Sequence, residues 1–186
     1  MKLVLASASP RRAELLTAAG FEFSIDAADV DETVVTGEAP DAYVARVALD
    51  KARTVAARYP DGAVVVAADT TVVADGTILG KPLDASEATS MLTQLSGKVH
   101  EVLTAIVVKT PTAELSDVVR TRVHFIELTG DDIAWYVATG ETDGKAGAYG
   151  IQGRAARFVD WIEGSWSNVV GLPIATVWQL IRRAHP

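Results

Sequence analysis

The pattern of apolar and polar positions predicts alternating strands and helices in the first half of the chain. The opening run KLVLA is typical of a buried strand, and residues 62–73, GAVVVAADTTVV, predict a strand covered on both faces. Between them, a helix from Pro40 to about Tyr59 carries an apolar stripe, formed by Val44, Val47, Ala48 and Val55. Lys51 falls on this stripe, so we expect it either to reach the helix edge or to point into a functional site.

The remaining pattern places most of the strands in the middle of the chain. The further expected elements, in chain order, are a helix from Pro10 to Gly20 capped by Ser9, a strand at 21–27, a tight turn at Asp75-Gly76, a helix from Asp84 and Glu87 through Leu95, strands at 99–110 and 114–128, a helix from Thr129 to about Thr139, a glycine-rich loop at 141–153, a strand at 157–164 and a last helix from Pro173. This order predicts an α/β or α+β fold, with a sheet of mixed direction covered by helices.

Composition narrows the class of protein. The net charge of −7 argues against a protein that coats nucleic acid, because neutralising phosphates needs clustered lysine and arginine. A nucleotide pocket needs only a few local cations and is not excluded. The chain has no cysteine, which excludes disulfides, thiolate metal sites and cysteine nucleophiles. No apolar stretch approaches the about 18 residues of a membrane span, so we expect a cytoplasmic protein with no membrane partner.

The stretch from Ser7 to Arg12 lies where a strand ends and a helix begins. Helix N-termini present free backbone N–H groups and a partial positive charge, which suit an anion. The hydroxyls of Ser7 and Ser9 and the guanidinium groups of Arg11 and Arg12 would add donors for a polyphosphate. The alternative is a pair of solvated arginines at an ordinary helix start.

Asp69 interrupts the apolar run at 62–73. A carboxylate there must be hydrogen-bonded, bound to a cation, or placed at the edge of a site. It could hold Mg²⁺ or orient a water molecule. The alternative is that it caps a turn, since Thr70 and Thr71 follow it.

Three further polar residues are weaker candidates on their own. Glu32 belongs to an acidic loop and Lys81 follows a hairpin, and both would ordinarily be solvated surface residues. Gln152 lies in the glycine-rich loop, where its amide could read a base edge because it both donates and accepts. Neither a GxxxxGK[ST] motif nor a GxGxxG motif after a strand is present, so neither usual nucleotide-binding fold is indicated.

Eight sequence blocks, in their order and spacing, make the chain resemble the Maf family, once called septum-formation inhibitors and now viewed as nucleoside triphosphate pyrophosphatases. The resemblance runs from Leu5 to the last helix. The blocks are LASASPRRAELL near the N-terminus, VDE at 30–32, ARVALDKA at 45–52, AADT at 67–70, GKPLD at 80–84, LSGKVHEV at 95–102, KAGAYGIQG at 145–153 and SNVVGLP at 167–173.

The resemblance implies a Maf/ITPase-like α/β fold with two lobes around a central cleft, as a single domain over residues 1–186, and a homodimer. It also implies metal-dependent hydrolysis of a nucleoside triphosphate between its α and β phosphates. The residue roles that it carries over are Asp69 as the catalytic carboxylate, Glu32 as its partner in binding Mg²⁺ or Mn²⁺ or handling water, Lys51 and Lys81 as catalytic cations, and Ser7, Ser9, Arg11, Arg12, Thr70 and Gln152 as substrate-binding residues.

Details of the blocks resemble the branch of the family that acts on dTTP and UTP. That branch looks like SPRR, ADT and Y-x-I-Q-G, whereas the branch acting on 7-methyl-GTP typically has an aromatic residue for the first arginine, SDQ for ADT, and a glutamate in the late loop. The neutral amide of Gln152 suits the imide edge of uracil or thymine. One departure is Gly150, where the pyrimidine branch often has alanine. Two alternatives stay open, namely a regulatory nucleotide-binding protein of cell division and an enzyme that cleaves another phosphoanhydride.

Overall fold

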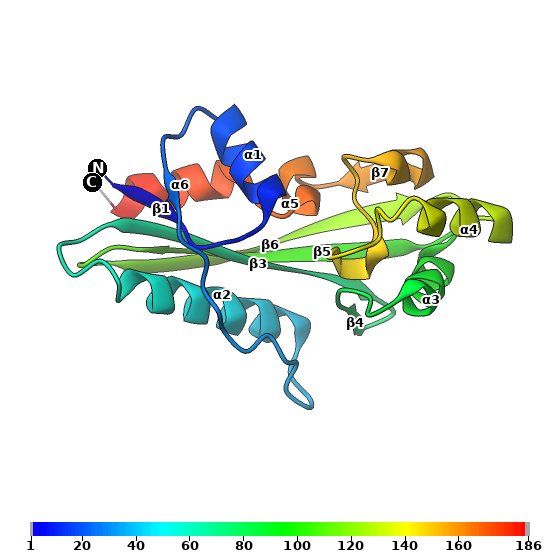
Figure 1. The fold of residues 1–186 in the computed structure, drawn as a ribbon, viewed down its shortest axis with the longest axis horizontal. Helices are drawn as coiled ribbons and strands as arrows, with labels where there is room; N and C mark the ends of the chain where they lie inside the picture. Colours follow the sequence, from blue (N-terminus) through cyan, green and yellow to red (C-terminus); the bar gives the residue numbers. More distant parts are fainter. Residues whose placement is uncertain (1, 185–186) are drawn as a thin grey trace. The chain divides into compact units, whose positions relative to one another are not determined.

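The computed structural model describes residues 2–184 (Figure 1). Helices and strands alternate from β1 to β3, as the hydrophobic pattern of the first half predicts. The strands are β1 (Leu3–Leu5), β2 (Ser24–Ile25), β3 (Val64–Ala74), β4 (Thr77–Leu79), β5 (Val99–Lys109), β6 (Glu114–Phe125) and β7 (Val159–Glu163). The helices are α1 (Pro10–Ala18), α2 (Pro40–Ala56), α3 (Ala85–Leu95), α4 (Gly130–Ala138), α5 (Trp166–Val170) and α6 (Ile174–Ala184), with 3-10 helices η1 (Ala146–Ala148) and η2 (Arg154–Phe158).

The strands of residues 2–184 form one mixed sheet. Its order is β2-β1-β3-β5-β6-β7, and β4 pairs with β3. Strand β1 is parallel to both β2 and β3, whereas the pairs β3–β4 and β6–β7 are antiparallel. The predicted mixed α/β sheet flanked by helices is therefore confirmed. Among the helices of the described residues, none has the length and apolar character that crossing a membrane requires.

The internal contacts divide the chain into two compact units. The first contains the chain up to Thr70, residues 104–119 and the chain from Gly171, and the second contains residues 71–103 and 120–170. The single domain over residues 1–186 and its central cleft, which the resemblance implies, stay predictions.

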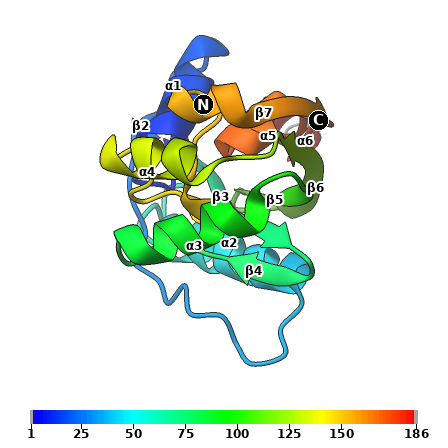
Figure 2. The same cartoon turned by 90° about the vertical axis from the view of Figure 1, so that its right-hand side faces the viewer.

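In the first unit, helices cover both faces of the strands. Helix α2 lies against one face, and α1 and α6 lie on the other (Figures 1 and 2). The predicted apolar stripe of α2 is confirmed, because each of its four apolar members is fully buried, namely Val44, Val47, Ala48 and Val55. Lys51 is also buried on this face, with 7% of its surface exposed. A lysine thus lies between a helix and a sheet, and its ammonium needs partners there.

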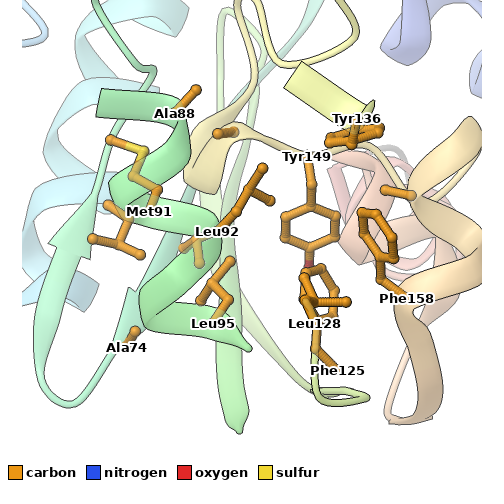
Figure 3. Packing of buried hydrophobic residues seen from close by; sticks show 14 of the residues in the cluster. Ala74, Ala88, Met91, Leu92, Leu95, Phe125, Leu128, Tyr136, Tyr149 and Phe158 are labelled. Atoms are coloured by element: carbon orange, nitrogen blue, oxygen red, sulfur yellow. The ribbon is translucent and has the colours of Figure 1, made fainter. Parts of the chain in front are cut away.

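The second unit has its own hydrophobic core, which packs α3 against a group of aromatic side chains. The core members from α3 are Ala88, Met91, Leu92 and Leu95, and the aromatic members are Phe125, Tyr136, Tyr149 and Phe158 (Figure 3). The rings of Phe125 and Tyr149 meet edge to face at a centroid distance of 4.8 Å. His100 joins this group, and its Nε2 lies 2.8 Å from the Tyr149 hydroxyl.

Several element boundaries differ from the expectation. Ser9 occupies the N-cap position of α1, but its side chain makes no capping hydrogen bond. The strand expected at 21–27 is reduced to Ser24–Ile25, because only these residues pair with β1. The short helix α5 was not predicted, and its local signal is Ser165, whose hydroxyl accepts a hydrogen bond from the Asn168 amide.

The glycine-rich loop contains one position where a side chain cannot fit. Gly147 has φ +65°, and a Cβ there would lie 2.9 Å from Val72 Cγ2. We expect Gly147→Ala to lower the free energy of unfolding by about 2–4 kcal/mol, from backbone strain plus overpacking. Gly140→Ala is the matched control, because its φ is +72° but no atom lies within 4 Å, so it should cost only about 1 kcal/mol. Equal losses in urea unfolding would contradict the packing argument.

His100 makes the fold sensitive to acid. Burial, followed by repulsion from His124, lowers the pKa of His100 to about 4. The neutral ring is favoured in the folded state, so its stabilisation is complete above the unfolded pKa of about 6.5 and is lost as the pH falls through about 4. We expect up to about 3 kcal/mol of acid-dependent unfolding free energy from this group. His100→Gln should flatten that part of the pH profile, and an unchanged slope between pH 6.5 and 4 would show that the ring is not its source.

Candidate active site

Strand β3 continues where its neighbour β1 stops, and the predicted site residues gather at this point. Leu5, the last residue of β1, pairs with Val66, while β3 runs on through Asp69 and Thr70 to Ala74. Asp69 therefore lies inside a longer strand and does not end it. Successive side chains of a strand point to opposite faces, so Asp69 and Thr70 belong to different faces of the sheet.

On the α2 face, Lys51 joins the two predicted catalytic carboxylates. Its Nζ lies 2.8 Å from Asp69 Oδ1 and 2.6 Å from Glu32 Oε1. The side chains of Lys51 and Asp69 are 9% and 8% exposed, whereas that of Glu32 is 38% exposed. A buried ammonium is stable only when paired, and here one cation is held by two anions. Lys51 therefore points toward these two carboxylates and not toward the helix edge, and its catalytic role stays a prediction.

Helix α2 also fixes the loop that carries Glu32. The Tyr43 hydroxyl donates to the Glu32 backbone carbonyl at 3.1 Å, and Arg46 donates to the Thr33 carbonyl at 3.0 Å. Arg46 forms a bidentate pair with Glu38, with both N–O distances at 2.8 Å. The acidic loop is therefore held against α2 by directional bonds, and Glu32 is not simply a solvated residue of a polar loop.

The Tyr43 phenol lies in the electrostatic field of the same carboxylates. Burial raises the pKa of Tyr43 to about 12, and the negative charges of Asp69 and Glu32 act in the same direction. Tyr43 therefore stays neutral and acts as a hydrogen-bond donor near neutral pH. Nothing in the sequence pattern distinguished it from the other apolar-face residues of α2.

On the opposite face, Arg12 is buried in a network of neutral oxygens. It is 8% exposed, and its Nε donates to the Gly171 carbonyl at 2.8 Å. Its Nη1 donates to Ser7 Oγ at 3.1 Å and its Nη2 to Thr70 Oγ1 at 3.0 Å. Arg12, Ser7 and Thr70, which were predicted together as substrate-binding residues, are thus brought together.

The two arginines differ in their surroundings. Burial lowers the pKa of Arg12, the charge of Arg11 lowers it further, and Asp69 and Glu32 raise it. Arg11 is only partly buried, and desolvation lowers its pKa while Glu14 raises it. Arg12 and Arg11 therefore repel each other, and Arg12 is balanced by the same carboxylates that bind Lys51. A phosphate group would add negative charge where two cations are crowded.

The N-terminus of α1 completes this group. Ser9 is partly buried at the N-cap with Pro10 next, and its side chain leaves the first-turn N–H groups uncapped. Free N–H groups at a helix start are a favourable position for an anion. Ser7 Oγ accepts from the Ser9 amide at 3.2 Å, which fixes the loop between β1 and α1.

Lys81 and Gln152 belong to the second compact unit and are exposed. Lys81 follows β4, and Gln152 lies between η1 and η2. That these residues act together with Asp69 stays a prediction.

Sequence reasoning missed two contributors to the Arg12 network. The Gly171 carbonyl accepts from Arg12, and Gly171 has φ +122°, a conformation that side chains rarely adopt. Thr104 of β5 is fully buried, and its Oγ1 lies 2.9 Å from Thr70 Oγ1. A threonine in an apolar strand is common, so only the structure distinguishes this one.

The donor set around Lys51 fits a hard divalent cation that is shared with phosphate. Asp69 and Glu32 converge on one nitrogen, and each has a second carboxylate oxygen. Mg²⁺ is typically held by one or two carboxylates together with phosphate oxygens and water. Within residues 2–184, no cluster of three or more acidic or histidine side chains could hold a metal by itself. Asp69 and Glu32 are therefore the residues that could contribute to such a site.

Known proteins resemble this chain over nearly its whole length. The family described as Maf-like protein matches residues 2–184. The dTTP/UTP pyrophosphatase of Koribacter versatilis (strain Ellin345) is 50% identical over 184 residues, which cover 99% of this chain and 95% of that protein. The dTTP/UTP pyrophosphatase of Myxococcus xanthus (strain DK1622) is 52% identical over 182 residues, covering 98% and 92%.

A solved structure, the nucleoside-triphosphatase / dITP/XTP pyrophosphatase from Mycobacterium abscessus, aligns with a TM-score of 0.41 and 17% identity over 69% of this chain and 76% of that one. A likeness this low carries no argument about the fold or the site. The full-length family match and the relatives with half their residues identical are decisive, and the chain belongs to the Maf family.

Proposed function

We propose that this chain is a nucleoside triphosphate pyrophosphatase that hydrolyses the bond between the α and β phosphates of dTTP and UTP. The products are a nucleoside monophosphate and pyrophosphate, and the cellular role is the cleansing of nucleotide pools. The observation that carries the proposal is the buried Lys51 ammonium between Asp69 and Glu32. The names of the full-length relatives support the choice of substrate.

In the proposed reaction, Asp69 orients a water molecule and accepts its proton. The water oxygen bonds to the α-phosphorus, the bond from that phosphorus to the bridging oxygen breaks, and pyrophosphate leaves with the bonding electrons. Lys51 orients the Asp69 carboxylate through its 2.8 Å contact. Arg11, Arg12, Lys51 and Lys81 stabilise the negative charge that develops on the phosphates.

Asp69 and Glu32 would hold Mg²⁺ or Mn²⁺, which supplies positive charge to the phosphate oxygens when bound. Ser7, Ser9 and Thr70 lie around the arginines and belong to the phosphate-binding side of the site in this proposal. Gln152 reads the pyrimidine imide edge through its donor and acceptor. The proposal also includes a cytoplasmic location and a homodimer. Sedimentation of the purified protein would check the homodimer.

Product analysis tests the reaction directly. Purified protein with Mg²⁺ and a panel of nucleoside triphosphates should release pyrophosphate, with dTTP and UTP fastest. Asp69→Asn keeps the shape of the side chain but removes the base, so we expect a loss of about 10²–10⁴-fold in turnover. Asp75→Asn is the matched control, because Asp75 lies in the β3–β4 turn and pairs with the exposed Lys98 at 2.9 Å; it should keep normal turnover.

The products also separate the alternatives. Orthophosphate with a nucleoside diphosphate would show cleavage of the terminal anhydride instead. Binding of nucleotide without release of any phosphate product would favour the regulatory reading. An Asp69→Asn protein with near-normal pyrophosphate release would refute the role of Asp69.

The specificity assignment predicts a second result. Gln152→Glu replaces a donor-acceptor amide with an anion, which cannot donate to the carbonyl oxygens of uracil or thymine. We expect kcat/KM for dTTP and UTP to fall about 10- to 100-fold, since a buried polar group left unpaired costs about 1–3 kcal/mol. Cytidine triphosphate, measured in parallel, should lose less. An equal loss for every nucleotide would contradict base reading by Gln152.

A further inference from the structure

Thr104 is a polar residue inside an otherwise apolar stretch of β5. Its neighbours Leu103 and Ala105 are each 1% exposed, and Thr104 itself is 0% exposed. Its Oγ1 lies 2.9 Å from Thr70 Oγ1. Both threonines belong to the same compact unit as Arg12 and Gly171. A buried hydroxyl in this position forms a hydrogen bond with Thr70 and so helps to fix the Thr70 side chain.

The contacts of Thr70 connect Thr104 to Arg12. Thr70 Oγ1 accepts from Arg12 Nη2 at 3.0 Å and lies 3.4 Å from the Gly171 carbonyl. A hydroxyl has one hydrogen and two acceptor positions, and a carbonyl can only accept. Either threonine hydroxyl can donate in the 2.9 Å contact between Thr70 and Thr104. In both cases Thr104 holds the Thr70 hydroxyl, which accepts from Arg12.

Arg12 has more N–H donors than these protein contacts use. Its guanidinium has five N–H donors, and Gly171, Ser7 and Thr70 each accept one. One N–H on Nη1 and one on Nη2 are left for a ligand. They lie on the two terminal nitrogens, from which a guanidinium can donate to oxygens of a phosphate. The orientation of this pair depends on Thr70, and the orientation of Thr70 depends on Thr104.

We infer that Thr104 is a positioning residue, which acts through Thr70 to aim the terminal N–H groups of Arg12 at the phosphates of the substrate. The inference rests on the proposed function and adds to it a residue that touches neither substrate nor reacting atoms. It also gives Thr70 a supporting role, since its hydroxyl holds the arginine.

Kinetics of three Thr104 variants test this role. Thr104→Val removes the hydroxyl and keeps the shape, and we expect kcat/KM for dTTP to fall about 3- to 10-fold, the range for one neutral hydrogen bond. Thr104→Ser keeps the hydroxyl and should restore activity to within about twofold of the wild type. Thr104→Ala is a second hydroxyl-free variant, used if the valine variant does not give the native circular dichroism spectrum.

Thr110→Val is the matched control. Thr110 is a similarly buried threonine that follows β5, 4% exposed, and its hydroxyl accepts from the Ala113 amide at 2.9 Å. It lies about 20 Å from Thr104 at the spacing of an extended strand. Its loss should reduce stability without lowering kcat/KM, so a purely structural effect of removing a threonine hydroxyl is measured separately.

A double-mutant cycle with Arg12→Met distinguishes a positioning role of Thr104 from a purely structural one. If Thr104 acts through Arg12, Thr104→Val should cause less than a twofold further loss in the Arg12→Met background. The inference is overturned if Thr104→Val has normal kcat/KM in an active enzyme, or if its loss is the same with and without Arg12; the proposed function would survive both results. Absence of pyrophosphate release by the wild type would instead overturn the proposed function, and the inference with it.

Discussion

The arrangement depends on one buried cation, the Lys51 ammonium between Asp69 and Glu32. Three charges at the face between α2 and β3 are tolerated only because each is paired, and removing one leaves an uncompensated charge. This constraint explains features that are otherwise unrelated. A lysine interrupts the apolar stripe of α2, a carboxylate interrupts the apolar strand β3, and an irregular acidic loop is tied down by Tyr43 and Arg46. Any local rearrangement that separates these groups would leave a buried charge unpaired.

The site also depends on the unequal length of two neighbouring strands. Because β1 ends at Leu5 while β3 continues, Thr70 meets Arg12, which also donates to Ser7 in the loop before α1. The carboxylates occupy the α2 face and the arginine network occupies the other. Both carboxylates stabilise the charge of Arg12, because Asp69 and Glu32 raise its pKa whereas burial lowers it. Anionic and cationic halves are thus kept apart by one strand yet remain electrostatically coupled.

Much of this arrangement could be predicted from charged residues that interrupt an apolar run of the sequence. Lys51 and Asp69 stand out because each is charged within an apolar run, and the structure pairs them. Glu32 could not be singled out in the same way, because acidic loops are usually solvated; its role came from the resemblance to the family.

The adjacent Arg11 and Arg12 look equivalent in sequence, but the helical turn of α1 buries Arg12 and leaves Arg11 partly exposed. Thr104 and the Gly171 carbonyl gave no signal, since one is an ordinary strand residue and the other a backbone group. Lys81 and Gln152 stay predictions, as they belong to the second compact unit.

The central claim is that the paired charges around Lys51 carry the chemistry, and a single-turnover measurement with Lys51→Met tests it most directly. Lys98→Met, which alters an exposed lysine paired with Asp75, is the control. With both variants folded by circular dichroism, dTTP cleavage should slow at least about 100-fold in Lys51→Met and stay normal in Lys98→Met. A folded Lys51→Met protein that cleaves dTTP at nearly the wild-type rate would contradict the account.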